Sequence, residues 1–264
     1  MLYLLCFIIV TLAGFYAFLF FSQKSRYKKV QVLQQDILKR YPVSFSYPRQ
    51  DLPTFDQHIA QIPQFLPDEL FKQLHDVAVR SLYTERSYLP THKKGGTVSY
   101  EALHKLAPEL IAFYHSATLQ QICSAVVGSL VVPTPLHDQS SCSLLVYERV
   151  GDHINWHYDH NFYTGKHYTV LLPLVNENYL KHELSSAQLW IKQKEQAIMI
   201  PTPPNTLVIF EGAKVLHKAT KLGENERRIL LSMTFCINPQ APVLKSVARR
   251  MKDTAFFGIR ALWT

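Results

Sequence analysis

The residue types with the clearest capacity for chemistry are two histidines and an aspartate. His157 and Asp159 form a His-x-Asp pair that follows a β-rich run at 143–149 and a turn. Side chains two positions apart in an extended chain point to the same side, so this pair can address one metal ion together. His217 follows sixty residues after His157, at the end of the segment TLVIFEGAKVLH, and completes a candidate set of three ligands.

Two imidazoles and one carboxylate on one face leave further coordination positions of a metal ion open. This donor set is typical of non-haem Fe(II) oxygenases, which use the open positions for a cosubstrate and O₂. A His-x-Asp pair by itself is weak evidence in a chain with 12 histidines. His153, His160 and His167 lie near the pair, and we weigh each as a substrate contact against the more common role of a solvated or locally hydrogen-bonded side chain.

An arginine beyond the third ligand supports the metal hypothesis. Arg228 lies eleven residues after His217, at the start of the run RRILLSMTF. A guanidinium pairs bidentately with a carboxylate, so this residue suits a dicarboxylate that chelates the metal at its other end. Arg227 is the alternative. The residues in phase with Arg228 are partly polar (Leu230, Ser232, Thr234), whereas those in phase with Arg227 are apolar (Ile229, Leu231, Met233, Phe235), and this alternation favours Arg228 for the pocket face.

The elements that position these residues change in character along the chain. Amphipathic patterns predict helices at 67–82 and 108–127, the second ended by Gly128. After Pro133 short β-rich runs follow, at 143–149, 168–175, 187–191, 197–200, 206–210 and 229–237. This order predicts an α+β chain in which supporting helices precede an antiparallel barrel or sandwich.

Over about residues 60–237 the sequence resembles the prolyl-4-hydroxylase-like branch of the 2-oxoglutarate- and Fe(II)-dependent dioxygenases. The segments that carry the resemblance are FLPDELFKQLHDVA, APELIAFYHSATLQQICSAVVG, VYERVGDHINWHYD, HYTVLLPLVNEN, PTPPNTLVIFEG and LHKATKLGENERR. The resemblance implies a double-stranded β-helix, that is, a jelly-roll or cupin-like barrel. It is the combination and order of these segments that is specific, not any one of them.

The resemblance also implies the residue roles and the reaction. His157, Asp159 and His217 would bind Fe(II), and Arg228 would hold the distal carboxylate of 2-oxoglutarate, with Tyr147 facing the cosubstrate and Ser232 supporting Arg228. The expected activity is hydroxylation of a C–H bond with release of succinate and CO₂, and ascorbate is a candidate accessory reductant. A peptidyl proline or another protein side chain is the expected substrate, with a lipid or other small molecule as the alternative.

The sequence departs from the family pattern at two places. A Gly-Gly-x-Leu turn often precedes the middle strand in the family, but this chain has LSSAQL at 184–189. Pro173 stands where relatives offer a second tyrosine to the distal carboxylate. Two other functions are weighed. A non-enzymatic, membrane-tethered cupin-like binding protein would be expected to have a degenerate ligand set, and an iron halogenase would lack the carboxylate that Asp159 supplies.

The N-terminus carries an uncharged run of about twenty residues, LYLLCFIIVTLAGFYAFLFF. As a helix it would span roughly 30 Å, the thickness of a bilayer core, so we expect a single-pass transmembrane anchor. A cleaved signal peptide is the rival, but the run is too long and lacks a preceding basic residue and a cleavage site. Positive charges follow the run at Lys24, Arg26, Lys28 and Lys29, which favours a cytoplasmic location for the catalytic domain.

These expectations divide the chain into four segments. They are a transmembrane anchor at 1–22, a helical stalk and linker at 23–60, a dioxygenase domain at 61–240 with its barrel core at about 140–237, and a basic amphipathic tail at 241–264. The tail either packs on the domain, which we favour, or lies on the membrane surface. The loop predicted at 91–99 is a candidate lid over the barrel mouth, with an ordinary surface loop as the alternative.

Composition excludes several classes of protein. Hydrophobic residues make up 47% and charged residues 18% of the 264 positions, so the chain is not disordered. Its formal charge of +8 is spread thinly, and no RNA-binding or zinc-finger motif accompanies it, so we expect no nucleic-acid partner. Cys123, Cys142 and Cys236 are too far apart in sequence for a zinc site or a disulfide framework, and we expect buried free thiols.

Overall fold

The computed structural model describes residues 2–80, 84–89 and 92–257, without most side chains of residues 2–23. The helices are α1 (Leu2–Arg40), α2 (Asp68–Val79), α3 (Tyr100–Leu106), α4 (Pro108–Tyr114), α5 (Ala117–Val127) and α6 (Val243–Phe257), with short 3-10 turns at Arg49–Asp51 and Asp56–His58. The strands are β1 (Ile59–Ile62), β2 (Glu85–Leu89), β3 (Lys93–Val98), β4 (Val132–Pro133), β5 (Cys142–Tyr147), β6 (His153–His157), β7 (Thr164–Asn178), β8 (Leu189–Gln193), β9 (Gln196–Ile200), β10 (Leu207–Phe210), β11 (Leu216–Ala219) and β12 (Glu226–Asn238).

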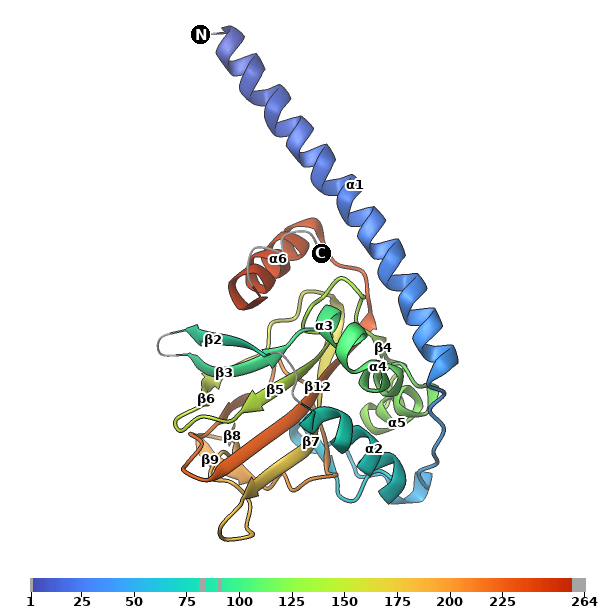
Figure 1. The fold of residues 1–264 in the computed structure, drawn as a ribbon, viewed down its shortest axis with the longest axis vertical. Coiled ribbons are helices and arrows are strands. Elements are labelled where there is room, and N and C mark those ends of the chain that lie inside the picture. Colours follow the sequence, from blue (N-terminus) through green and yellow to red (C-terminus); the bar gives the residue numbers. More distant parts are fainter. Residues whose placement is uncertain (1, 81–83, 90–91, 258–264) are drawn as a thin grey trace.

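The strands within these ranges form one antiparallel sheet. Its main path runs β1-β10-β7-β12-β5-β3-β6-β11-β8-β9, while β2 pairs with β3 and β4 pairs with β12. The sheet curls so that strands from both ends of the path line one cavity. Helices α2 to α5 lie together on one side of the sheet (Figure 1). The expected architecture, helices first and then a jelly-roll-like sheet, is confirmed at this level.

Strand β12 shows how one sequence pattern builds both the core and the cavity. Its alternate residues Ile229, Leu231, Met233 and Phe235 belong to the main hydrophobic core under the helices. The intervening residues Arg228, Leu230, Ser232 and Thr234 line the cavity on the other face. Long β7 lies on one side of β12 and β5 on the other, so β12 is fixed in register from both edges.

The predicted helix at 108–127 is two helices. Helix α4 ends at Tyr114, and α5 begins at Ala117 after Ser116, whose hydroxyl accepts a hydrogen bond from the backbone of Leu119. A serine in this position is a favoured N-cap, so the break has a local cause. Gly128 closes α5 with a φ of 68°, as predicted from its place after the apolar pattern.

The prediction of a loop at 91–99 is wrong over most of that range. Residues Lys93–Val98 form β3, which pairs with β2, β5 and β6. Two glycines and two lysines give this segment a low intrinsic strand preference, so neighbouring strands, not local propensity, impose the extended conformation. The segment is therefore part of the barrel wall and neither a lid nor a surface loop.

The N-terminal helix is longer than the two segments expected there. Helix α1 runs unbroken from Leu2 to Arg40, and Ile37 near its end is buried in the main core. Along the described part of the chain, no single helix is long and apolar enough to cross a membrane. The bent pair α4 and α5 meets that criterion only when taken together. Most side chains of the expected anchor lie outside the described residues, so the anchor stays a prediction.

The C-terminal helix α6 packs on the domain through charged side chains. Arg249 donates to the backbone carbonyl of His137 (2.7 Å) and to Asp253 (2.6 Å). Lys252 donates to the Ser140 hydroxyl at 2.8 Å, and both Arg249 and Asp253 are buried. The prediction of a packed tail is thus met for Val243–Phe257, and the described contacts are ionic and polar.

The cysteine prediction is confirmed for the described residues. Cys123, Cys142 and Cys236 are all buried free thiols. Burial raises the pKa of each thiol, so none is a reactive thiolate at neutral pH.

Candidate metal centre

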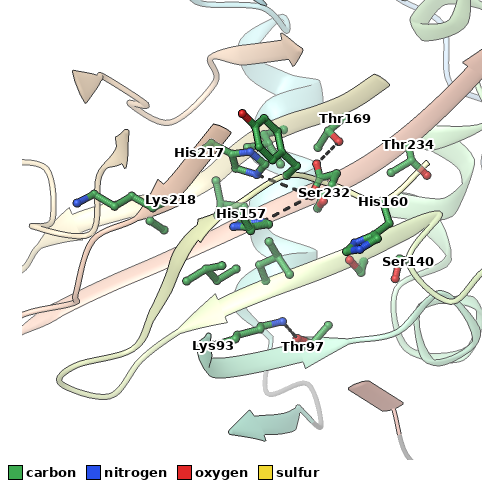
Figure 2. A pocket seen from close by; sticks show the side chains of 18 of the residues that line it. Lys93, Thr97, Ser140, His157, His160, Thr169, His217, Lys218, Ser232 and Thr234 are labelled. Atoms are coloured by element: carbon green, nitrogen blue, oxygen red, sulfur yellow. Dashed lines mark hydrogen bonds and ion pairs between the residues drawn. The ribbon is translucent and has the colours of Figure 1, made fainter. Parts of the chain in front are cut away.

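The structure brings His157, Asp159 and His217 together. His157 ends β6 and lies directly opposite His217 in the pairing of β6 with β11. The two imidazole rings are 4.1 Å apart between centroids, and candidate ligand atoms of all three residues lie within 4.8 Å of one another. One oxygen of Asp159 is 3.6 Å from Nε2 of His157 and 3.8 Å from Nε2 of His217. Figure 2 shows both histidines on neighbouring strands at one side of the cavity.

Backbone carbonyls orient both imidazoles. Nδ1 of His157 is 2.7 Å from the carbonyl oxygen of Asn155, and Nδ1 of His217 is 2.9 Å from that of Val215. A neutral imidazole that donates from Nδ1 keeps the lone pair on Nε2, and Nε2 is the atom that faces Asp159 here. Such hydrogen bonds fix the tautomer and raise the ligand strength of the ring.

Asp159 is held from two directions by residues that the sequence analysis did not single out. Its backbone N–H donates to the carbonyl of Gly212 at 3.0 Å, and one carboxylate oxygen accepts from the Thr169 hydroxyl at 2.5 Å. A Cβ at Gly212 would lie 2.6 Å from the Asp159 side chain. Glycine is therefore required at 212 by the close approach of the aspartate, which leaves the second carboxylate oxygen directed at the histidines.

The electrostatics favour the protonation states that metal binding needs. Burial lowers the pKa of His157 to about 4, with help from the neighbouring His217, so the ring is neutral at physiological pH. Burial alone would raise the pKa of Asp159, but His217, His157 and the Thr169 hydroxyl outweigh it and lower that pKa. A neutral imidazole and an ionised carboxylate are the forms in which histidine and aspartate bind a metal ion, so these shifts suit His157 and Asp159 as ligands.

Arg228 lies in the same cavity with a guanidinium that is poorly satisfied. It is 1% exposed, and its Nε has no hydrogen-bond partner among the described residues. Tyr147 stands directly across from it in the pairing of β12 with β5, with its ring centroid 5.4 Å from the guanidinium carbon. Burial lowers the pKa of Arg228 and raises that of Tyr147 to about 12, so the arginine is still charged and the phenol is a donor.

The cavity between these groups has a volume of about 290 Å³. Its lining includes the three candidate ligands, Arg228, Tyr147 and Ser232, as well as His160 and His167. Arg227 and His153 do not line it. This volume is of the size that a small dicarboxylate and part of a substrate occupy. A buried, incompletely satisfied arginine at a distance from a two-histidine, one-carboxylate cluster fits a ligand that is anionic at one end and chelating at the other.

Lys93, Lys218 and Lys252 line the cavity, and none of them was assigned to the site from the sequence. Lys93 of β3 is buried, and its ammonium donates to the Thr97 hydroxyl at 2.8 Å (Figure 2). Burial, together with the nearby Lys252, lowers the pKa of Lys93 to about 8. Lys252 reaches the cavity from α6. Sequence pattern did not place Lys93 or Lys252 in the cavity, because β3 has weak strand propensity and because nothing in the sequence shows which face of α6 packs on the barrel.

The turn that lacks the expected glycines is held by side chains. Glu226 accepts hydrogen bonds from the backbone N–H of Ser186 (2.9 Å), from the Ser186 hydroxyl (2.6 Å) and from the N–H of Gly223 (2.7 Å). None of residues 184–189 has a positive φ. The glycines are therefore unnecessary at this turn, and Leu189 enters β8 beside the cavity.

Solved structures share this fold. A 2OG-Fe(II) oxygenase-family oxidoreductase from Burkholderia pseudomallei aligns with a TM-score of 0.56 at 12% identity, over 71% of this chain and 89% of its own. A Trichoplax adhaerens prolyl hydroxylase, solved with a peptide fragment of the hypoxia inducible factor oxygen degradation domain, gives 0.54 at 12%, over 78% and 91%. The epimerase SnoN, solved with Fe³⁺, alpha ketoglutarate and nogalamycin RO, gives 0.54 at 10%, over 70% and 82%.

The likeness is one of fold and is not accompanied by close sequence similarity. No protein-family model matches the sequence, and no curated protein gives a significant match. What this chain shares with these solved oxygenases is the jelly-roll-like fold, and in this chain a His-Asp-His cluster lies in the cavity of that fold.

Proposed function

We propose that this chain is an Fe(II)- and 2-oxoglutarate-dependent dioxygenase that hydroxylates a substrate C–H bond. One observation carries the proposal: a single cavity holds two oriented imidazoles with an ionised carboxylate and, apart from them, a buried arginine with an unsatisfied N–H. When bound, Fe(II) and 2-oxoglutarate would supply the oxidation, with one atom of O₂ entering the substrate and the other ending in succinate as CO₂ is released.

The residues of the chain have separate tasks in this proposal. His157, Asp159 and His217 hold the metal, and Thr169 and Gly212 position Asp159. Arg228 pairs with the distal carboxylate of 2-oxoglutarate, Tyr147 donates its hydroxyl nearby, and Ser232 lines the same wall. The apolar remainder of the lining excludes water from the reacting groups.

A peptidyl proline or another protein side chain is the substrate class that we propose first. It is supported by the sequence resemblance and by the fold shared with a prolyl hydroxylase that was solved with a peptide. A lipid or other small molecule is the alternative. Incubation with proline-containing peptides, followed by mass spectrometry for a gained oxygen, tests the first class. If extracted lipids gained oxygen and no peptide did, a lipid would become the favoured substrate class and a protein side chain the rejected one.

The activity is tested by succinate formation from 2-oxoglutarate with Fe(II) and O₂, with and without ascorbate. We expect turnover by the parent chain and none by His157→Ala or Asp159→Ala. His153→Ala is the matched control, because His153 lies on the same strand, hydrogen-bonds to the Gly151 carbonyl and does not line the cavity. Equal turnover by all variants would refute the proposal, while iron binding without turnover would support the non-enzymatic binding protein.

The proposed location is a membrane, with residues 2–21 as a single-pass anchor and the barrel on the cytoplasmic side. The support is the uncharged N-terminal run and the basic residues directly after it. Alkaline carbonate should fail to release the full chain from membranes, and protease added to intact cells should leave the barrel uncut. Release by carbonate would contradict the anchor.

A further inference from the structure

Helix α6 packs with the polarity of its faces reversed. An amphipathic helix on a globular domain normally turns its apolar stripe to the core and its charges to water. Over the described side chains of α6, residues 243–255, the large apolar ones point outward: Val243 is 81% exposed, Leu244 82%, Val247 46% and Met251 68%. Their spacing places them on one continuous stripe of the helix surface. Figure 1 shows α6 lying across the end of the domain, away from the main core.

The inner, charged face keeps α6 in this orientation. Arg249 and Asp253 are buried and paired at 2.6 Å, and Arg249 also donates to the His137 carbonyl. Lys252 stands 3.0 Å from Asp253 and 3.6 Å from buried Asp138. Rolling the helix to bury its apolar stripe would separate Lys252 from buried Asp138 and Arg249 from the His137 carbonyl. Breaking a buried ion pair is strongly unfavourable. The stripe is therefore held outside by the fold.

Helix α6 and the part of α1 that follows the uncharged run contact the same residue of the domain. Tyr27 of α1 packs against the ring of His137 with centroids 5.9 Å apart, and the carbonyl of that same His137 accepts from Arg249 of α6. Figure 1 shows α6 beside the middle of α1. Lys24, Lys28 and Lys29 are exposed on α1 at this level. The helix with the exposed apolar stripe and the lysine-bearing part of α1 are thus linked through one residue, just beyond the end of the uncharged run.

We infer that the outer face of α6 lies on the surface of a bilayer that contains anionic lipid. This inference rests on the proposed anchor at 2–21, which would place the bilayer surface at the level of Tyr27. The stripe from Val243 to Met251 enters the boundary between headgroups and acyl chains, and the lysines of α1 meet lipid phosphates. Lys252 belongs to α6 and lines the cavity, so the cavity lies about one helix diameter, roughly 10 Å, from the lipid.

Nitroxide labels on the full-length chain test this contact. The label is placed at Met251→Cys, with Cys6 replaced by Ser and the remaining cysteines buried. Two further labels are needed. Leu180→Cys, 74% exposed in the loop after β7, is the aqueous control, and Val10→Cys, 70% exposed, reports on the anchor. Accessibility to O₂ and to a water-soluble nickel complex is measured in vesicles of phosphatidylcholine with and without phosphatidylserine.

We expect the Met251 label to favour O₂ over the nickel complex several-fold more than the Leu180 label does, and more strongly with phosphatidylserine. A lipid-like signal at Val10 with an aqueous signal at Met251 would overturn the α6 inference and leave the anchor standing. Aqueous signals at all three positions would overturn both. A Met251 label shielded from both reagents regardless of lipid would indicate a protein cover, such as a second copy, and would also overturn the inference.

Discussion

Gly212 is the residue on which the position of Asp159 depends most directly. The Asp159 side chain fills the space that a side chain at position 212 would need. A Cβ at 212 would lie 2.6 Å from the Cβ and from one carboxylate oxygen of Asp159. We predict that Gly212→Ala shifts Asp159 and weakens Fe(II) binding by roughly 10–100-fold, the range seen when groups that orient metal ligands are lost. Anaerobic Fe(II) titration gives the affinity.

Gly95→Ala is the matched control for that substitution. Gly95 lies in β3 of the same barrel, but a Cβ there would make only ordinary contacts, the nearest at 3.6 Å. This variant should bind Fe(II) as tightly as the parent. Unchanged affinity in Gly212→Ala would show that the chain can relax around the methyl group, and the positioning role assigned to Gly212 would be wrong.

A second prediction separates the two neighbouring arginines. Arg228→Lys keeps the charge but removes the fork that grips a carboxylate, so the KM for 2-oxoglutarate should rise by roughly 10–100-fold, as expected for loss of about 1.5–3 kcal/mol of charged hydrogen bonding. Arg227→Lys is the control, because Arg227 lies outside the cavity lining. Succinate formation at varied 2-oxoglutarate measures both. A larger effect of Arg227→Lys would show that Arg227 binds 2-oxoglutarate and that the assignment to Arg228 is wrong.

At the scale of elements, two partly buried, neutral histidines lie where α3 packs against the end of α4. Nε2 of His115 forms a hydrogen bond of 2.7 Å with the Tyr100 hydroxyl. Burial lowers the pKa of His115 to about 3. Burial also lowers the pKa of His104, beside the same Tyr100 ring, to about 4. An unfolded chain binds these protons near pH 6.5, so the stabilisation is complete above that pH and is lost as the pH falls toward the folded values.

We therefore predict that the free energy of unfolding of the metal-free protein falls between pH 7 and pH 4. One histidine of this kind contributes a slope of up to about 1.4 kcal/mol per pH unit in that window. His115→Gln should make the slope shallower, which urea denaturation at several pH values would measure. A variant with the slope of the parent would mean that His115 is not protonated on unfolding in this range.

Patterning was most informative for elements with an apolar face. The runs predicted at 143–149, 168–175 and 229–237 correspond to β5, β7 and β12, since each buries alternate or continuous apolar residues in the main core. Strands β3, β6 and β11 were not predicted as such. They are short and rich in Lys, His, Gly and Asn, and pairing with neighbouring strands is what makes them extended.

The same contrast holds within the candidate site. Residue type and spacing predicted His157, Asp159, His217 and Arg228, and strand alternation placed Arg228 toward the cavity. Gly212, Thr169 and Lys93 escaped prediction because their roles depend on distances between segments far apart in the chain. A glycine in a turn, such as Gly212, or a threonine in a strand, such as Thr169, carries no local signal for contact with a metal ligand.

At the scale of the whole molecule, metal binding should stabilise the fold. The three candidate ligands belong to β6, the segment after it and β11, so an ion ties these parts of the barrel together. We predict that Mn(II), an O₂-inert stand-in, with 2-oxoglutarate raises Tm, by an amount equivalent to about 2.7 kcal/mol at one hundred times Kd. Thermal scanning should show the shift in the parent and none in Asp159→Ala. An equal shift in both would place the metal elsewhere.

His157 and His217 are directly paired residues of β6 and β11, so the geometry of the metal site depends on the register of these two strands. A slip of one residue between these strands would turn one histidine to the opposite face of the sheet. Only the correctly registered barrel can then present both imidazoles to one ion. Iron taken up during synthesis would thus select the native pairing of two short strands that have little apolar surface to select it themselves, and misregistered chains would be left without metal.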